Sequence, residues 1–169
     1  MCHGTALRVG MALLAALSVG GLGSLPAGAE GSLAMAVLTT PNTRVAPLTS
    51  FTVEVVVRSE QPIQAVDLAV AWDGARLLGV DVAPHAEFDD DEGLLLQPLM
   101  ALGSFSRIVD VRHGGPGASG IFRVATLRFI SGPTPGPTAI TIKSLGLGFR
   151  DGDEPAELWT MPLEIRVGS

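Results

Sequence analysis

The 169-residue sequence contains no tyrosine and only one cysteine, Cys2. A single cysteine near the start of the chain leaves the rest without an internal disulfide and without a thiol nucleophile. No Gly-x-Ser-x-Gly stretch occurs, so the nucleophile elbow of serine hydrolases is also missing. Long runs of Lys and Arg are absent, and 17 acidic residues outnumber 11 basic ones. This balance argues against nucleic acid and anionic membranes as partners.

Residues 1–29 have the pattern of a secretory signal. Arg8 precedes an apolar run over 9–22, and small residues at 27–29 form a cleavage site before Glu30. The run is short and rich in glycine, and no later stretch approaches the roughly 20 apolar residues of a membrane-spanning helix. We therefore predict a secreted, extracellular protein whose mature domain covers 30–169.

Short β-rich runs fill the mature chain and are separated by clusters of Pro, Gly, Asn and Asp. No stretch keeps a helical period, so the pattern predicts an all-β fold, a single antiparallel β-sandwich of about nine strands. Loops are predicted over 114–117 and 132–137, where Gly and Pro interrupt the hydrogen-bonding pattern. The expected strands lie near 33–38, 51–58, 64–72, 77–83, 94–97, 105–112, 122–130, 139–149 and 162–167.

Alternation along the strands predicts which side chains face the core. In the strand over 64–72, Val66, Leu68, Val70 and Trp72 share one phase, and this phase is predicted to face inward. The same reasoning turns two further sets inward, which are Phe51, Val53, Val55 and Val57, and Leu163, Ile165 and Val167. Phe129 is also predicted to face the core.

Candidate catalytic and metal sites are weak. The acidic stretches Asp89–Glu92 and Asp151–Glu154 fall in predicted turns, where solvated carboxylates are common. A structural Ca²⁺ ion is a remaining hypothesis for the first stretch, although it lacks the spacing of an EF-hand loop. His85 and His113 are isolated loop histidines without a third ligand. We predict no catalytic residues, no metal ligands and no required cofactor.

The phrase Trp72-Asp73, followed by Leu77 and by Ala125-x-Leu127-x-Phe129, resembles the cohesin family. Cohesins have an alternating strand that ends in an aromatic-Asp pair, a short turn with a Leu soon after, and a later strand of the Ala-x-Leu-x-Phe type. The resemblance extends from about residue 34 to 167. It implies the jelly-roll or immunoglobulin-like topology of a cohesin sandwich.

The resemblance also implies a non-catalytic module that binds a protein partner. Cohesins bind dockerin modules through one outward sheet face that includes the strand matching 64–72. Family members often present an Asn-x-Asp pair there. Asp67 matches the Asp, whereas Ala65 replaces the Asn, so the expected partner is a dockerin or a divergent protein. The expected contact residues are Ala65, Asp67, Ala69 and Ala71.

Direct carbohydrate binding is the alternative, because sugar-binding modules share the sandwich architecture. Such modules stack sugars on exposed aromatic rings, and Trp159 and Phe88, with Phe122 as a third candidate, are the rings left outside the inward phase. Either function fits a secreted protein of extracellular assemblies that are linked to polysaccharide breakdown. An exported partner protein or a polysaccharide would then be the ligand.

Overall fold

The computed structural model describes residues 33–88, 96–101, 105–112, 115–149 and 157–168, and groups Gly31–Ser169 into one compact unit. Its ten strands are β1 (Leu33–Thr39), β2 (Arg44–Val45), β3 (Ser50–Trp72), β4 (Leu77–Pro84), β5 (Leu96–Ala101), β6 (Phe105–Val111), β7 (Ala118–Ser131), β8 (Gly136–Phe149), β9 (Glu157–Met161) and β10 (Leu163–Val167). Within the part of the chain that the structure describes, no helix has the length and hydrophobicity of a membrane span.

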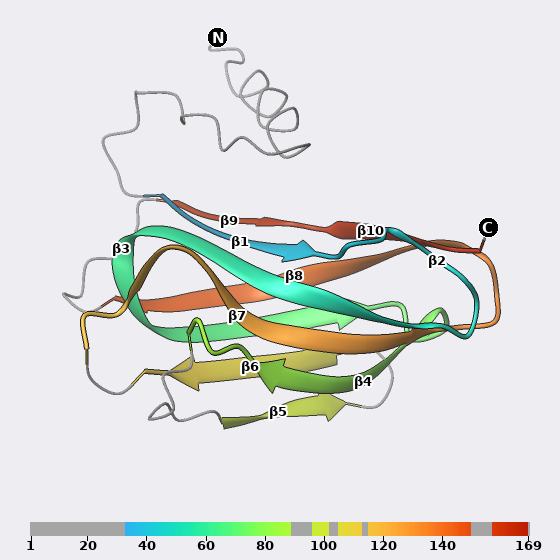
Figure 1. Cartoon of the computed structure of the whole chain (residues 1–169), viewed down its shortest axis with the longest axis horizontal. Helices are drawn as coiled ribbons and strands as arrows, with labels where there is room; N and C mark the ends of the chain where they lie inside the picture. The colour runs from blue at the N-terminus through green and yellow to red at the C-terminus, as the bar shows by residue number, and fades with distance from the viewer. Residues whose placement is uncertain (1–32, 89–95, 102–104, 113–114, 150–156, 169) are drawn as a thin grey trace, which may run out of the picture. The chain divides into compact units, whose positions relative to one another are not determined.

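The long strand β3 takes part in both layers of the fold. Residues 50–59 pair with β1 and β7, whereas residues 65–72 pair with β6 and β8, and Ile63 at the bend pairs with both β7 and β8. The register shifts after Ser59, whose hydroxyl donates a hydrogen bond to the Gln61 carbonyl oxygen at 2.8 Å. Pro62 follows directly and has no N–H to continue the ladder. Figure 1 shows β3 turning back on itself at this point.

The two layers follow from these pairings. The first layer has the strand order β9–β1–β3–β7–β4, and the second has the order β2–β10–β8–β3–β6–β5. Most neighbours are antiparallel, but β9 runs parallel to β1, and β2 runs parallel to β10. The predicted all-β sandwich is confirmed, with these two parallel pairs as an addition.

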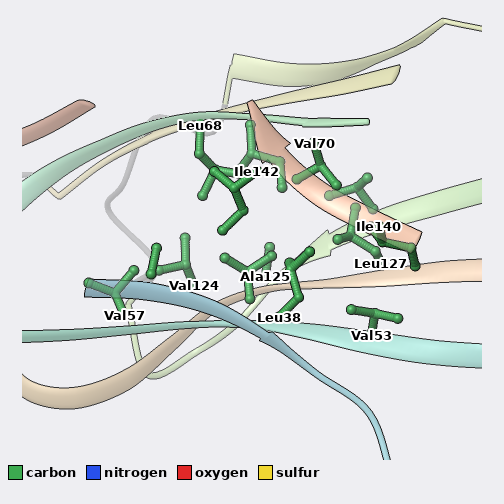
Figure 2. Close-up of a cluster of buried hydrophobic side chains, with 14 of the residues drawn as sticks. Leu38, Val53, Val57, Leu68, Val70, Val124, Ala125, Leu127, Ile140 and Ile142 are labelled. Carbon is green, nitrogen blue, oxygen red and sulfur yellow. The ribbon is translucent and has the colours of Figure 1, made fainter. Parts of the chain in front are cut away.

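The core lies between the layers and contains the inward phases that the sequence predicts. Val53 and Val57 of the first layer face Leu68 and Val70 of the second, and all four side chains are fully buried (Figure 2). Large aromatic rings extend this packing. Phe129 is fully buried, and its ring meets that of Trp72 edge to face at 5.0 Å between centroids. Burial of these side chains is the main favourable term that holds the layers together.

Several details differ from the sequence expectations, among them the bounds of β5, expected near 94–97, and of β7, expected near 122–130. The runs 51–58 and 64–72 form one bent strand, and the sequence analysis missed β2 and β9, which are short strands at the outer edges. The predicted loop over 132–137 ends early, because β8 already begins at Gly136. Pro137 is tolerated there because the pairing of β8 with β3 starts only at Ile140, so one side of β8 has no ladder at Pro137.

Candidate functional site

The outward side of the second layer forms a continuous surface over three neighbouring strands, which we call the β8–β3–β6 face. Its β3 residues are exposed by alternation, because Val66, Leu68 and Val70 point into the core. The strand register places the other outward residues beside them. The face consists of Thr141, Ser144, Gly146 and Gly148 from β8, Ala65, Asp67, Ala69 and Ala71 from β3, and Arg107, Val109 and Val111 from β6.

Small residues leave the backbone uncovered over part of this face. Gly148 lies opposite Ala65, and Gly146 lies opposite Asp67. A Cβ atom built on Gly148 would lie 2.9 Å from the Cβ of Ala65, closer than real Cβ atoms approach one another. One built on Gly146 would meet Asp67 only at ordinary contact distance, 3.6 Å or more. The backbones of β3 and β8 are therefore open to close approach by another molecule along these positions.

The charged centre of the face is an ion pair between Asp67 of β3 and Arg107 of β6. The guanidinium donates two hydrogen bonds, from Nε to Oδ1 at 2.9 Å and from Nη2 to Oδ2 at 2.6 Å. This hydrogen bonding from Arg107 is the main cause that lowers the pKa of the Asp67 carboxyl below its usual range, and it raises the pKa of Arg107. Both groups stay accessible, with 43% of the Asp67 side chain and 58% of the Arg107 side chain exposed.

The pair changes what the face offers a partner. Two of the five N–H groups of the Arg107 guanidinium are used by Asp67, so three remain as donors. Lys143, which is exposed at an irregularity in the pairing of β8 with β3, lies next to Ser144 in the chain. Together, Asp67, Arg107 and Lys143 carry a net positive charge, whereas the whole chain has a formal charge of −6.

The four contact residues predicted on β3 all lie on the β8–β3–β6 face, but their accessibility differs. Ala65, Asp67 and Ala71 are partly exposed. Ala69 is only 6% exposed, because its register neighbours Ser144 and Arg107 flank a side chain of one methyl group. Ala69 therefore adds little contact area of its own.

The aromatic candidates for sugar binding differ in how much of each ring is exposed. Phe88 is fully buried and stacks on Phe122 at 5.5 Å between ring centroids, with 13° between the ring planes. The expectation of exposed rings is therefore wrong for Phe88, and it is also wrong for Phe122, which is 5% exposed. The guanidinium of Arg112 lies 5.9 Å from the Phe88 centroid, which adds a cation–π contact. Trp159 is 45% exposed on β9 and remains an accessible ring.

The other candidates of the sequence analysis contribute little to a site. Asp89–Glu92, Asp151–Glu154 and His113 lie outside the described residues. His85 is partly buried, and its Nδ1 accepts a hydrogen bond from the Glu87 backbone N–H at 3.2 Å. Across the residues that the structure does describe, no group of three or more His, Cys, Asp or Glu side chains is placed to hold a metal ion.

Arg107 is the member of the face that the sequence analysis missed. It is separated from Asp67 by 40 residues, and only the pairing of β6 with β3 brings the two side chains together. The available signal was the alternation over 105–112, where Ile108 and Asp110 take the inward phase. That alternation turns Arg107 outward, but it does not tell which strand lies beside β6.

The structure is similar to solved cohesin modules. A non-cellulosomal cohesin from the archaeon Archaeoglobus fulgidus matches with a TM-score of 0.65 and 14% identity, covering 80% of this chain and 91% of that one. The cohesin module of a family 33 glycoside hydrolase from Clostridium perfringens matches with a TM-score of 0.66 and 9% identity, covering 81% and 98%. The sixth cohesin of scaffoldin B from Acetivibrio cellulolyticus, solved in complex with a dockerin, matches with a TM-score of 0.63 and 14% identity, covering 80% and 97%.

These likenesses establish a cohesin-like fold for the chain. No family model matches the sequence, and no curated protein matches it significantly. At 9 to 14% identity, the shared feature of the three structures above is their architecture. A shared architecture does not by itself give this chain a function.

Proposed function

We propose that this protein is a secreted, non-catalytic docking module that binds a partner protein through the β8–β3–β6 face. The observation that carries the proposal is the combination of a small-residue surface with one accessible ion pair, on a cohesin-like fold. Several solved structures of this fold are complexes of a cohesin with a dockerin. A dockerin-type partner, or a divergent one, is the proposed ligand.

The physical case rests on a preformed surface. The face is built on hydrogen-bonded strands, so binding orders little additional backbone and loses little conformational entropy. Gly146, Gly148 and Ala65 let a partner approach the backbone closely, and Val109 and Val111 add apolar area beside them. Such a surface suits a rigid partner element with small or apolar side chains.

The charges suggest the chemistry of the partner. Arg107 and Lys143 outnumber Asp67, so a partner with a carboxylate opposite Arg107 would gain hydrogen bonds from its remaining donors. The Asp67 carboxylate is held in place by Arg107 and still has free lone pairs. It can accept a hydrogen bond from a partner hydroxyl or N–H without first losing conformational freedom.

Three further parts of the proposal rest on the sequence. Residues 1–29 act as a secretory signal that is removed, residues 30–169 form the exported domain, and the assembly is extracellular and linked to polysaccharide breakdown. The signal follows from the charged, apolar and small-residue segments of 1–29. The link to polysaccharide comes from the resemblance to cohesins.

Direct polysaccharide binding is a second candidate that one observation favours. Trp159 exposes 45% of its surface on β9, and its register partner on β1 is Met35, which is partly exposed on the outward side of the first layer. A single ring can stack on one sugar face. Burial of Phe88 and Phe122 leaves this candidate with a narrower platform than the sequence predicted.

The test begins with affinity capture of exported proteins from the source organism on the domain 30–169, with and without Ca²⁺, beside a panel of insoluble polysaccharides. Any captured protein is then titrated against variants by calorimetry. Asp67→Ala should weaken binding about tenfold, which corresponds to a loss of about 1.4 kcal/mol of binding free energy at a charged contact near the centre of the face. Folding should be nearly unchanged, since exposed ion pairs contribute about 1 kcal/mol or less to stability.

Asp81→Ala is the matched control. Asp81 also forms an accessible ion pair across two strands, with Arg128 at 3.7 Å, but on the β4–β7 side of the first layer. Its removal should leave partner binding unchanged. Equal affinity of the Asp67 variant and the wild type would remove the β8–β3–β6 face from the proposal. Retention on a polysaccharide that Trp159→Ala abolishes, without any protein partner, would favour the second candidate.

A further inference from the structure

A hollow of about 660 Å³ lies where β2, β10 and β8 meet, away from the β8–β3–β6 face. It is bordered by Arg44 of β2 and Arg166 of β10, and by Pro135 with Gly136, the first residue of β8. Figure 1 shows β2 at the end of the unit opposite the bend of β3. The hollow uses only the first residue of β8, whereas the β8–β3–β6 face uses residues 141–148.

The two arginines are direct neighbours in the sheet. β2 and β10 run parallel, and Arg44 is the register partner of Arg166. The next residues in each strand, Val45 and Val167, are 6% and 1% exposed, so the arginines occupy the opposite, exposed side of both strands. Like charges placed directly opposite each other destabilise a sheet. This arrangement therefore costs stability unless a negative group lies between or above the two guanidinium groups.

No described side chain supplies that negative group within ion-pair distance. The ion pairs found among the described residues involve Arg76, Arg107, Arg123 and Arg128, but neither Arg44 nor Arg166. Glu164 shares the exposed side of β10 with Arg166, two positions earlier, and its register partner is Ala139 of β8. The residues 40–46 around Arg44 contain no acidic side chain.

The walls of the hollow are held in place by hydrogen bonds. The backbone N–H of Arg166 donates to the Thr43 carbonyl oxygen at 2.7 Å, and that of Gly168 donates to the Val45 carbonyl oxygen at 2.9 Å. In addition, Arg76 Nη1 donates to the Pro135 carbonyl oxygen at 2.9 Å. A preorganised site of this kind loses little entropy when a ligand enters.

We propose that Arg44 and Arg166 form a binding site for an oxyanion, either a carboxylate or a phosphate group. Guanidinium groups match both classes with planar, paired N–H donors, and two of them side by side can hold one oxyanion from two directions. Pro47 and Pro135 add apolar walls against which the body of a compact ligand, such as a sugar acid, can pack. This site is independent of the proposed docking function.

The test is an NMR titration of the ¹⁵N-labelled protein at constant ionic strength. The ligands are sodium phosphate and sodium glucuronate, with glucose and sodium chloride as controls. We expect saturable shifts of the amide signals of residues 44–46, 136 and 166–168 with at least one oxyanion, and none with glucose. The stronger of the two ligands then tells a phosphate site from a carboxylate site.

Variants decide whether the arginines are responsible. The double variant Arg44→Gln with Arg166→Gln should bind at least tenfold more weakly, and the double Lys variant, which keeps the charge but loses the planar fork, should bind several-fold more weakly. Arg128→Gln, an exposed arginine in the first layer, should bind like the wild type. The proposal is overturned if chloride produces the same shifts as the oxyanions, or if the double Gln variant, shown by circular dichroism to be folded, binds with unchanged affinity.

Discussion

Truncation of Trp72 tests the core packing that positions the β8–β3–β6 face. Trp72 is 6% exposed at the end of β3, and its ring meets Phe129 edge to face at 5.0 Å. Trp72→Ala removes nearly the whole buried ring and leaves a cavity, for which a loss of about 3–5 kcal/mol is expected. The edge-to-face contact accounts for roughly 0.5–1.5 kcal/mol of interaction beyond simple area burial.

Trp72→Phe keeps an aromatic ring and removes the indole N–H, so it tests the cost of that buried donor separately from the packing of the ring. The indole Nε1 is buried and has no hydrogen-bond partner among the described residues. A buried donor without a partner costs about 1–3 kcal/mol, so its removal offsets part of the smaller cavity that phenylalanine leaves. We expect Trp72→Phe to lose less than about 1.5 kcal/mol, which is well below the loss for the alanine variant.

Urea denaturation followed by far-UV circular dichroism measures both losses. In a thermal scan followed by the same signal, a loss of this size should lower the melting temperature of the alanine variant by about 10–20 °C relative to the wild type. Trp159→Ala is the control, because this ring is 45% exposed and its truncation should cost well under half as much. Equal losses for Trp72→Ala and Trp159→Ala would refute the inward assignment of β3 and the cavity argument built on it.

Two further predictions concern the β8–β3–β6 face. Because hydrogen bonds from Arg107 lower the pKa of the Asp67 carboxyl, the pair contributes stability that is present above the unfolded pKa of about 3.9 and is lost as the pH falls through the lower folded value. The exposure of both groups keeps this contribution small. An NMR titration should find the pKa of Asp67 below the usual range of an aspartate, and Arg107→Gln should return it toward that range. An unchanged pKa in the Arg107 variant would contradict the assigned cause. Gly148→Ala should lower the free energy of unfolding in urea by about 1–3 kcal/mol, because the new Cβ would lie 2.9 Å from the Cβ of Ala65. Gly146→Ala is the control and should change the free energy of unfolding by no more than about 0.5 kcal/mol. Equal losses for the two variants would contradict the close approach of β8 to β3.

Much of the fold could be predicted from local sequence patterns. The period-two alternation over 64–72 and 51–57 correctly turned Val66, Leu68, Val53 and the other members of both phases toward the core. Alternation has this power because successive side chains of a strand point to opposite faces, whatever lies next to the strand. The same pattern identified the outward side of β3, and with it the part of the candidate face that belongs to that strand.

Local patterns were less informative where a side chain depends on distant neighbours. Phe88 follows β4 in a turn and has no strand phase, and its burial depends on the core into which it packs, where its ring stacks on Phe122 of β7. The short strands β2 and β9 escaped detection, because each is defined by a parallel partner, β10 and β1 respectively, rather than by its own alternation. With only two residues, β2 is also too short for a period to show.

The sequence by itself determined that the chain is all-β, which strand faces are apolar, and that Asp67 points outward, since all of these follow from periods within single strands. Tertiary structure alone decided the pairings across strands. Arg107 holds Asp67 from 40 positions away in the sequence, and Arg44 lies beside Arg166 although they are 122 positions apart. Both pairs depend on strand order and register, which are set by how the two layers pack and are not written into either segment.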